Sequence, residues 1–80
     1  MLGNEPRQDS QKKKVLAWLK EAGPITPIQA LQYFGSFRLA SIIHRLRREG
    51  YVIRTETIEE DGKYFAEYHY EGRIEELVTI

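Results

Sequence analysis

Two helical patterns meet at Gly35 and Ser36 with almost no chain between them. The segment from Thr26 to Gln29 begins the first pattern: threonine stands at the N-cap, proline at the first helical position and glutamine where a capping box requires it. Apolar residues then recur at helical spacing from Ile28 to Phe34, and the glycine ends the helix. Because serine is a good N-cap, the next helix is expected over residues 37–49. Two helices joined by a short turn that contains glycine indicate a helix-turn-helix motif.

Another helical pattern precedes this motif. It is expected to begin near Asp9 or Ser10, either of which can cap its free amides, and to end at Gly23 and Pro24. The apolar residues at helical spacing in it are Val15, Leu16 and Leu19, with Trp18 beside them. The three lysines at 12–14 fit a solvated face better than an anion-binding role. Residues 1–9 are polar after the first two and predict a disordered leader.

Beyond residue 50 the apolar period changes from near four to two. β-branched and aromatic residues alternate with polar ones over residues 51–58 and again over 64–70, on either side of Asp61-Gly62. This pattern predicts a β-hairpin. The fold class is therefore α+β, a winged helix-turn-helix of three helices followed by a β-hairpin wing, with the domain over residues 10–72. Residues 73–80 are left as a C-terminal tail.

The register of the hairpin has two solutions. A two-residue loop sets Glu56 opposite Glu67, whereas a four-residue loop sets Arg54 opposite Glu67. Opposite charges favour the second register. Both registers keep Ile53 and Tyr68 on one face of the hairpin, so the prediction that this face packs on the core does not depend on the choice.

The helix expected over residues 37–49 separates cleanly into two faces. Its core face holds Leu39, Ile43 and Leu46, with Ile42 at the edge. The opposite face holds Ser41, Arg45 and Arg48, flanked by Arg38 and His44, with Arg47 at the border. Arginine forms paired hydrogen bonds with phosphate oxygens or with the outer edge of guanine, and a short serine allows close approach to bases. This face is therefore suited to the major groove of DNA.

Simpler interpretations exist for several of these residues. Arginines near the C-terminal end of a helix also complement its dipole without any ligand. His44 fits an exposed helix histidine better than a catalyst or metal ligand. Phe37 is expected to pack rather than to stack on bases. Thr26, together with the open amides of the first turn of its helix, offers a further place for a phosphate.

Composition excludes several classes of function. The chain has no cysteine, so disulfides and thiolate metal sites are excluded, and its two histidines would need carboxylates to hold zinc. No apolar run is long enough to span a bilayer, and no secretion signal is present. No nucleophile–base pair or phosphate loop is visible. We therefore expect a cytoplasmic protein that is not an enzyme, with no membrane association, no cofactor and no metal.

The net charge of zero hides two halves of opposite sign. Residues 1–55 hold ten Lys/Arg against four Asp/Glu, whereas residues 56–80 hold two against eight. Such a contrast indicates two surfaces with different partners, or one surface that must avoid a wrong mode of docking.

The stretch from Pro24 to Tyr70 resembles a family of small winged helix-turn-helix domains common in phages and prophages. The similar segments are ITPIQALQYFG at 25–35, FRLASIIHRLRREGYVI at 37–53 and the aromatic return strand. The resemblance implies a DNA-binding or regulatory role, with Arg38, Ser41, Arg45 and Arg48 facing the groove. The chain departs from the family at the wing tip, where Glu59-Glu60-Asp61 precedes a single lysine and would be repelled by phosphate.

Two functions follow from these observations. The first is a phage- or prophage-type transcriptional regulator that reads double-stranded DNA with its third helix, with a homodimer as one way to read two half-sites. The alternative is a winged-helix protein-interaction or assembly module that does not bind DNA. The acidic wing and the neighbouring pair Ile58 and Phe65 support a protein partner at this end of the molecule.

Overall fold

The computed structural model describes the backbone of residues 7–77 and the side chains of residues 10–77. Its elements are α1 (Arg7–Glu21), α2 (Pro27–Phe34), α3 (Leu39–Arg48), β1 (Tyr51–Glu60), β2 (Lys63–Arg73) and the short α4 (Ile74–Leu77). Three helices followed by an antiparallel two-stranded hairpin confirm the predicted winged helix-turn-helix class. Helix α1 begins at Arg7, so residues 7–9 are helical; the remainder of the predicted leader lies outside the described residues.

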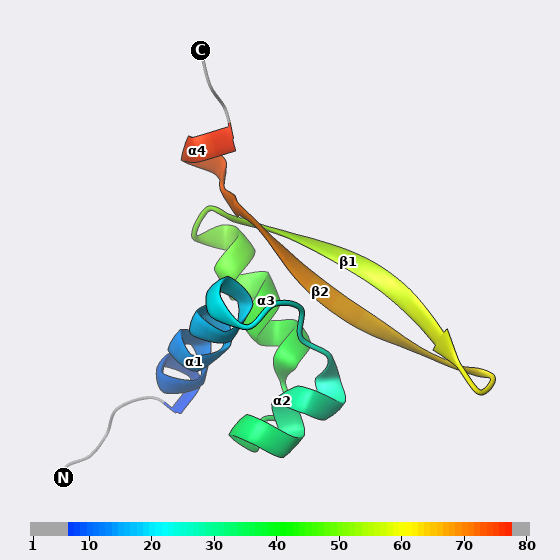
Figure 1. Cartoon of the computed structure of the whole chain (residues 1–80). Coiled ribbons are helices and arrows are strands. Elements are labelled where there is room, and N and C mark those ends of the chain that lie inside the picture. The colour runs from blue at the N-terminus through cyan, green and yellow to red at the C-terminus, as the bar shows by residue number, and fades with distance from the viewer. Residues whose placement is uncertain (1–6, 78–80) are drawn as a thin grey trace, which may run out of the picture.

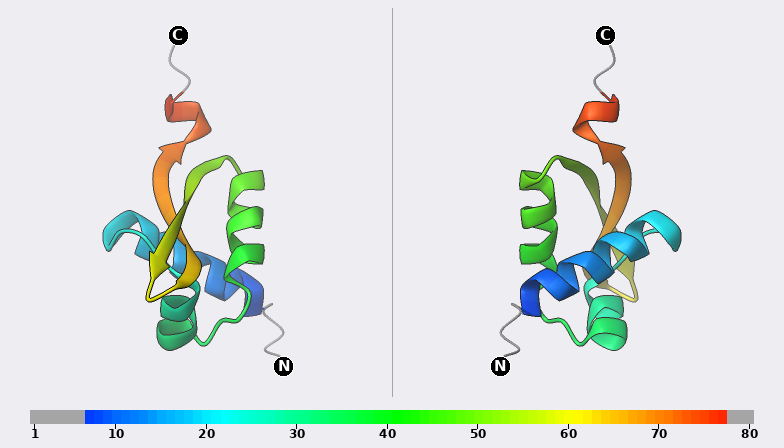
Figure 2. Two further views of the ribbon diagram at one scale, coloured as in Figure 1. Left: turned by 90° about the vertical axis from the view of Figure 1, so that its right-hand side faces the viewer. Right: turned by 90° about the vertical axis from the view of Figure 1, so that its left-hand side faces the viewer.

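The helices pack together and the hairpin extends from them (Figure 1). Helix α1 packs mainly against α3, and α2 lies below both in Figure 1. In both views of Figure 2, α3 stands at one margin of the molecule, with one side facing outward. No helix among the described residues has the length and apolar character needed to cross a bilayer.

The capping signals of α2 are confirmed. The Thr26 hydroxyl accepts the Gln29 amide at 3.3 Å, and the Gln29 side-chain oxygen accepts the Thr26 amide at 3.0 Å. At the other end Gly35 adopts the left-handed conformation, with φ at 65°, and donates its amide to the Leu31 carbonyl at 2.9 Å. This glycine is what allows the chain to reverse directly into the next helix.

Replacing Gly35 with alanine should lower the free energy of unfolding by about 1–2 kcal/mol, because an L-residue is strained at positive φ. The space around a Cβ at this position is open, with no heavy atom within 4 Å, so strain is the only cost. Urea unfolding of the variant measures this. Gly35→Asn is the matched control and should lose less, since asparagine tolerates the left-handed region; equal losses would contradict the explanation.

Helix α3 begins two residues later than its sequence pattern predicts. The Ser36 hydroxyl accepts the amide of Arg38, two residues on, at 3.2 Å and so closes a local turn instead of capping a helix at Phe37. Arg38 takes the N-cap position with φ −120° and ψ 39°, and no side chain caps it. The expected helix over residues 37–49 is therefore shortened to Leu39–Arg48.

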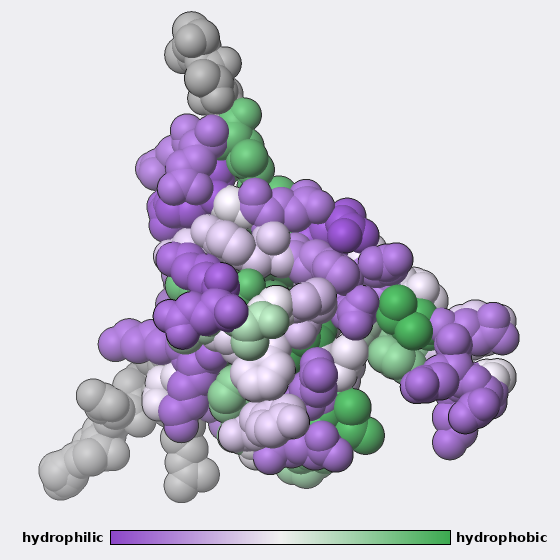
Figure 3. Space-filling view, in the orientation of Figure 1, coloured by the Kyte–Doolittle hydropathy of each residue, from purple (hydrophilic) through white to green (hydrophobic). Residues whose placement is uncertain are grey.

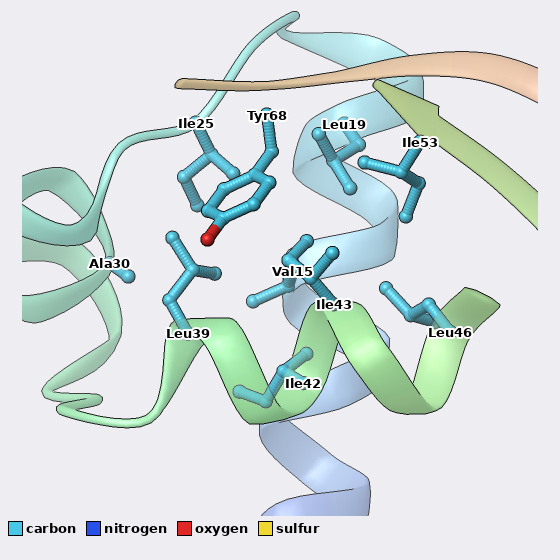
Figure 4. Close-up of a cluster of buried hydrophobic side chains, with 10 residues drawn as sticks. All are labelled: Val15, Leu19, Ile25, Ala30, Leu39, Ile42, Ile43, Leu46, Ile53 and Tyr68. Atoms are coloured by element: carbon cyan, nitrogen blue, oxygen red, sulfur yellow. The ribbon is translucent and has the colours of Figure 1, made fainter. Parts of the chain in front are cut away.

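One apolar core joins all three helices to the hairpin (Figure 4). Its buried members are Val15, Leu19, Ile25, Ala30, Leu39, Ile42, Ile43, Leu46, Ile53 and Tyr68. The predicted core face of α3 is confirmed, and Ile42, expected at its edge, is fully part of it. Ile53 and Tyr68 lie on the same face of the hairpin, as both registers required.

The hairpin takes the register that the charges disfavour. Glu60 pairs with Lys63, which leaves Asp61 and Gly62 as a two-residue turn with φ of 54° and 75°. Both φ values are positive, as a type I′ turn requires, and its twist matches that of the strands. Glu56 consequently lies opposite Glu67, and the expected pairing of Arg54 with Glu67 is wrong. Turn geometry outweighs the charge pairing, because an ion pair between exposed side chains stabilises the fold only weakly.

The hairpin is fixed to the helices at two further points. Ile25, between α1 and α2, forms an isolated bridge with Tyr68, with backbone hydrogen bonds of 3.0 and 2.9 Å. At the far end of β2, the Ile74 amide donates to the Gly50 carbonyl at 2.7 Å. The wing is thus held at its base while its tip projects (Figure 1).

Candidate nucleic-acid interface

The outward side of α3 carries most of the residues predicted to contact DNA. Ser41, His44 and Arg48 are exposed, whereas Arg45 is half-buried. The residues on the opposite side of the helix are buried in the core, so the packing of α3 fixes which way these four point. The exposure of His44 agrees with its interpretation as a surface histidine.

Arg38 lies at the end of this face rather than along it. It is exposed, but it precedes the first residue of α3 and belongs to the turn made by Ser36. Of the four residues predicted to face the groove, at 38, 41, 45 and 48, Arg38 is therefore the one that lies outside the helix. The Arg38 side chain is thus presented to solvent by the turn between α2 and α3.

The last turn of α3 forms a small cationic hollow. Arg45, Arg48 and Glu49 line about 360 Å³ of open space. The Glu49 carboxylate forms an ion pair with Lys12 of α1. The sequence could not reveal this contact, because Lys12 and Glu49 are 37 positions apart and no local pattern relates them. The neighbouring lysine lessens the negative field of Glu49 beside the two arginines.

Arg47 is also exposed, but its side chain has a structural role. Its Nε and Nη2 donate to the Ile53 carbonyl at 3.0 and 2.6 Å, and Nη2 also donates to the Thr55 hydroxyl at 2.8 Å. These bonds fix the end of α3 to β1 and satisfy a carbonyl at the edge of a two-stranded sheet. Its place at the border of the predicted face, between the core side and the outward side of α3, allows this contact.

Arg47→Ala should reduce the free energy of unfolding by about 1.5–3 kcal/mol, the net contribution of hydrogen bonds that involve a charged group. Urea unfolding of the whole chain checks the value. Arg48→Ala removes the same charge from an exposed neighbour and should change the unfolding free energy by less than about 0.5 kcal/mol. Equal effects from the two variants would show that the bonds to β1 do not stabilise the fold.

Thr26 is buried at the start of α2. Its side chain is 7% exposed, and its hydroxyl already accepts the Gln29 amide within the capping box. A hydroxyl buried in this way has little surface to offer a phosphate. Its structural contribution is the orientation of α2, which packs against α3 and holds it in place.

Phe37 is not the packing residue that the sequence predicts. It stands in the turn before α3, and 86% of its surface is exposed. Helical geometry explains this exposure: on a helical wheel position 37 lies opposite Leu39 and Leu46, so it would face away from the core even if α3 began earlier. An aromatic side chain this exposed has no role in the stability of the core.

The wing tip is acidic. Glu59, Glu60, Asp61 and Lys63 are all exposed there, and the end of the hairpin is hydrophilic in the space-filling view (Figure 3). The turn therefore presents three carboxylates and one amine to solvent. Such a tip disfavours contact with phosphates.

Further along the hairpin, Glu56, Glu67 and His69 place three possible metal-ligand atoms within 4.8 Å of one another. His69 Nε2 lies 2.9 Å from a Glu67 oxygen and 3.2 Å from a Glu56 oxygen. Arg54 donates to Glu71 at 2.9 Å and to Glu56 at 3.3 Å, and these bonds raise the pKa of Arg54 above its ordinary value. The guanidinium already supplies a cation to this carboxylate cluster. The grouping depends on the hairpin register, so the sequence could not reveal it.

Comparison with known proteins gives one match. A family model described as a winged helix-turn-helix domain matches residues 10–69, from a position within α1 to a position within β2. No curated protein and no solved structure matches the chain. The matched segment contains α2, the turn, α3 and most of the hairpin, which are the elements that define the fold. The chain therefore belongs to the winged helix-turn-helix domain family, and this membership suggests DNA binding.

Proposed function

We propose that the chain binds double-stranded DNA by placing α3 in the major groove. The observation that carries the proposal is the division of α3 into a fully buried apolar side and an outward side with Ser41, Arg45 and Arg48. His44 flanks this side, and Arg38 extends it beyond the end of the helix.

The chemistry of these side chains suits a groove that is lined by phosphates and base edges. Arginine is charged at all physiological pH values and pairs with phosphate through two parallel hydrogen bonds, or with guanine O6 and N7. Ser41 lies between arginines and is short enough to let the helix approach the bases. Arg45 and Arg48, around the cationic hollow, are positioned to hold the backbone and fix the register of the helix on the duplex.

The acidic wing sets this mode apart from one in which the wing also contacts DNA. Binding then depends on one helix in each chain, a small contact for a specific complex. A homodimer would supply a second helix for a second half-site. We therefore propose a dimeric transcriptional regulator of the phage or prophage type, acting in the cytoplasm.

Selection of bound duplexes from a random pool tests the proposal. We expect enrichment of a palindromic site, with an affinity that falls steeply as salt is raised because counterions are released from phosphates. A recovered single half-site would retain DNA binding but exclude the dimer. No measurable affinity for any duplex at low salt would overturn the proposed function.

Glu59→Lys should raise the affinity for duplex DNA by about fivefold, or roughly 1 kcal/mol, because it replaces repulsion at the wing tip with attraction. Electrophoretic mobility shifts at constant salt measure the change. Glu75→Lys, an exposed residue of α4, adds the same charge away from the wing and should have a smaller effect. Equal gains would mean that overall charge, not the wing, is responsible.

A further inference from the structure

An apolar hollow lies between the helices and the outer half of the hairpin. It has a volume of about 680 Å³, within the range of roughly 300–1,000 Å³ that ligand sites occupy in proteins. Its apolar wall includes Ile28 and Leu31 of α2, Phe37 of the turn and Phe65 of β2. In Figure 3 apolar surface lies both on the lower edge of the helical body and on the hairpin short of its tip.

These side chains are exposed far beyond what the fold requires. Phe37 is 86% exposed, Ile28 63% and Leu31 38%. Single exposed apolar residues are ordinary, but several that converge on one hollow mark an interaction site. Because they come from α2, the turn and β2, the fold itself brings them together.

The charges at this hollow have one sign. Glu60 and Glu67 are the only charged residues among the described ones that line it. Glu60 continues into the acidic wing tip through Asp61. A phosphate backbone is repelled here, so the hollow does not extend the DNA-binding surface of α3. A ligand that carries positive charge beside apolar groups is attracted.

We propose that this hollow binds a short peptide segment of another protein in which apolar side chains alternate with lysine or arginine. The apolar side chains would contact Phe37, Ile28 and Phe65, and the cations would pair with Glu60 and Glu67. A second copy of the chain could offer the exposed Ile74 and Leu77 of its α4 to the hollow, but these lie beside Glu75 and Glu76. Those carboxylates would be repelled by the acidic hollow, so charge complementarity favours the basic peptide over a second copy. The chain thus has two surfaces of opposite charge, one for nucleic acid and one for protein.

A displayed library of random short peptides, selected on the full chain, tests the proposal. We expect enrichment of sequences that combine aliphatic or aromatic residues with lysine or arginine. Synthetic copies of the enriched peptides are then titrated against variants by fluorescence anisotropy. Phe37→Ser and Glu60→Lys should each weaken binding by about tenfold or more, the ratio that corresponds to 1.4 kcal/mol.

Two matched variants control for composition and charge. Tyr64→Ser removes a 70% exposed aromatic residue of the hairpin that does not line the hollow, and Glu75→Lys changes the same charge on α4. Both should bind the peptides as the unchanged chain does. Thermal unfolding of Phe37→Ser should match the unchanged chain because Phe37 is outside the core.

Three outcomes would overturn the peptide proposal: no enrichment, enrichment of acidic peptides, or binding that is indifferent to Phe37→Ser and Glu60→Lys. Concentration-dependent dimerisation that Phe37→Ser abolishes would assign the hollow to a second copy instead. Duplex binding by Glu60→Lys is measured in parallel and should be retained or increased. Failure of the peptide site is therefore distinguishable from failure of the DNA proposal.

Discussion

Replacing Arg45 and Arg48 together with alanine should weaken binding to duplex DNA by about two to four orders of magnitude. Each charge-assisted hydrogen bond contributes about 1.5–3 kcal/mol, and each 1.4 kcal/mol is a factor of ten. The slope of log affinity against log salt should also fall by about two, because two phosphate contacts are lost. Fluorescence anisotropy with a labelled duplex, over a series of salt concentrations, measures both quantities.

The control for this prediction must remove the same charge from another surface. Lys20→Ala with Lys63→Ala does so, since both lysines are exposed, one on α1 and one at the wing. We expect a loss of less than about fivefold from this pair, through long-range electrostatics alone. If the two double variants lose affinity equally, DNA does not contact α3 in particular. Circular dichroism of the arginine double variant checks that it remains folded.

The second large effect concerns the core. Ile43→Ala should reduce the free energy of unfolding by about 2–5 kcal/mol, because Ile43 is fully buried at the centre of α3 and its loss leaves a cavity. Single domains have only about 5–15 kcal/mol in total, and one of this size lies toward the lower end. The variant is therefore expected to be partly unfolded at physiological temperature.

Graded substitutions make the core prediction specific. Ile43→Val removes one methyl group and should lose about 0.5–1.5 kcal/mol. Ile28→Ala removes the same atoms as Ile43→Ala, but from a side chain that is 63% exposed, and should lose less than about 1 kcal/mol. Urea unfolding measures all three. A loss below about 1 kcal/mol for Ile43→Ala would contradict the close packing of α3 against α1 and the hairpin.

Much of this fold could be predicted from the sequence because its signals are local. The capping box of Thr26 and Gln29 involves residues three positions apart, and the Asp61-Gly62 turn needs only the positive φ values that these two residues accept. The apolar face of α3 follows from helical spacing in the same way. Each of these features depends only on residues that are close together in the sequence.

The features that the sequence could not predict depend on competition between two local solutions or on contacts between residues far apart in the chain. The register of the hairpin was a choice between turn geometry and charge pairing, and Glu56 opposite Glu67 shows that the turn prevailed. The start of α3 depends on whether the Ser36 hydroxyl caps a helix or bonds to Arg38, and both are good local solutions.

The candidate site was predictable to the same extent. The outward position of Ser41, His44 and Arg48 follows from helical geometry once the core face is known. The ion pair of Lys12 with Glu49 and the bonds from Arg47 to β1 need the tertiary structure, because α1, α3 and β1 meet there. The apolar hollow also requires it, since Ile28 and Phe65 are brought together only by the packing of the hairpin.

The bridge between Ile25 and Tyr68 has a consequence for how the chain is made. It joins the segment before α2 to the return strand of the hairpin, so the backbone of Ile25 has no partner until β2 is in place. On the ribosome, the three helices emerge well before Tyr68 and cannot complete the core on their own. Folding is therefore expected to wait for nearly the whole domain to be synthesised, and a chain released short of β2 would be a substrate for proteases.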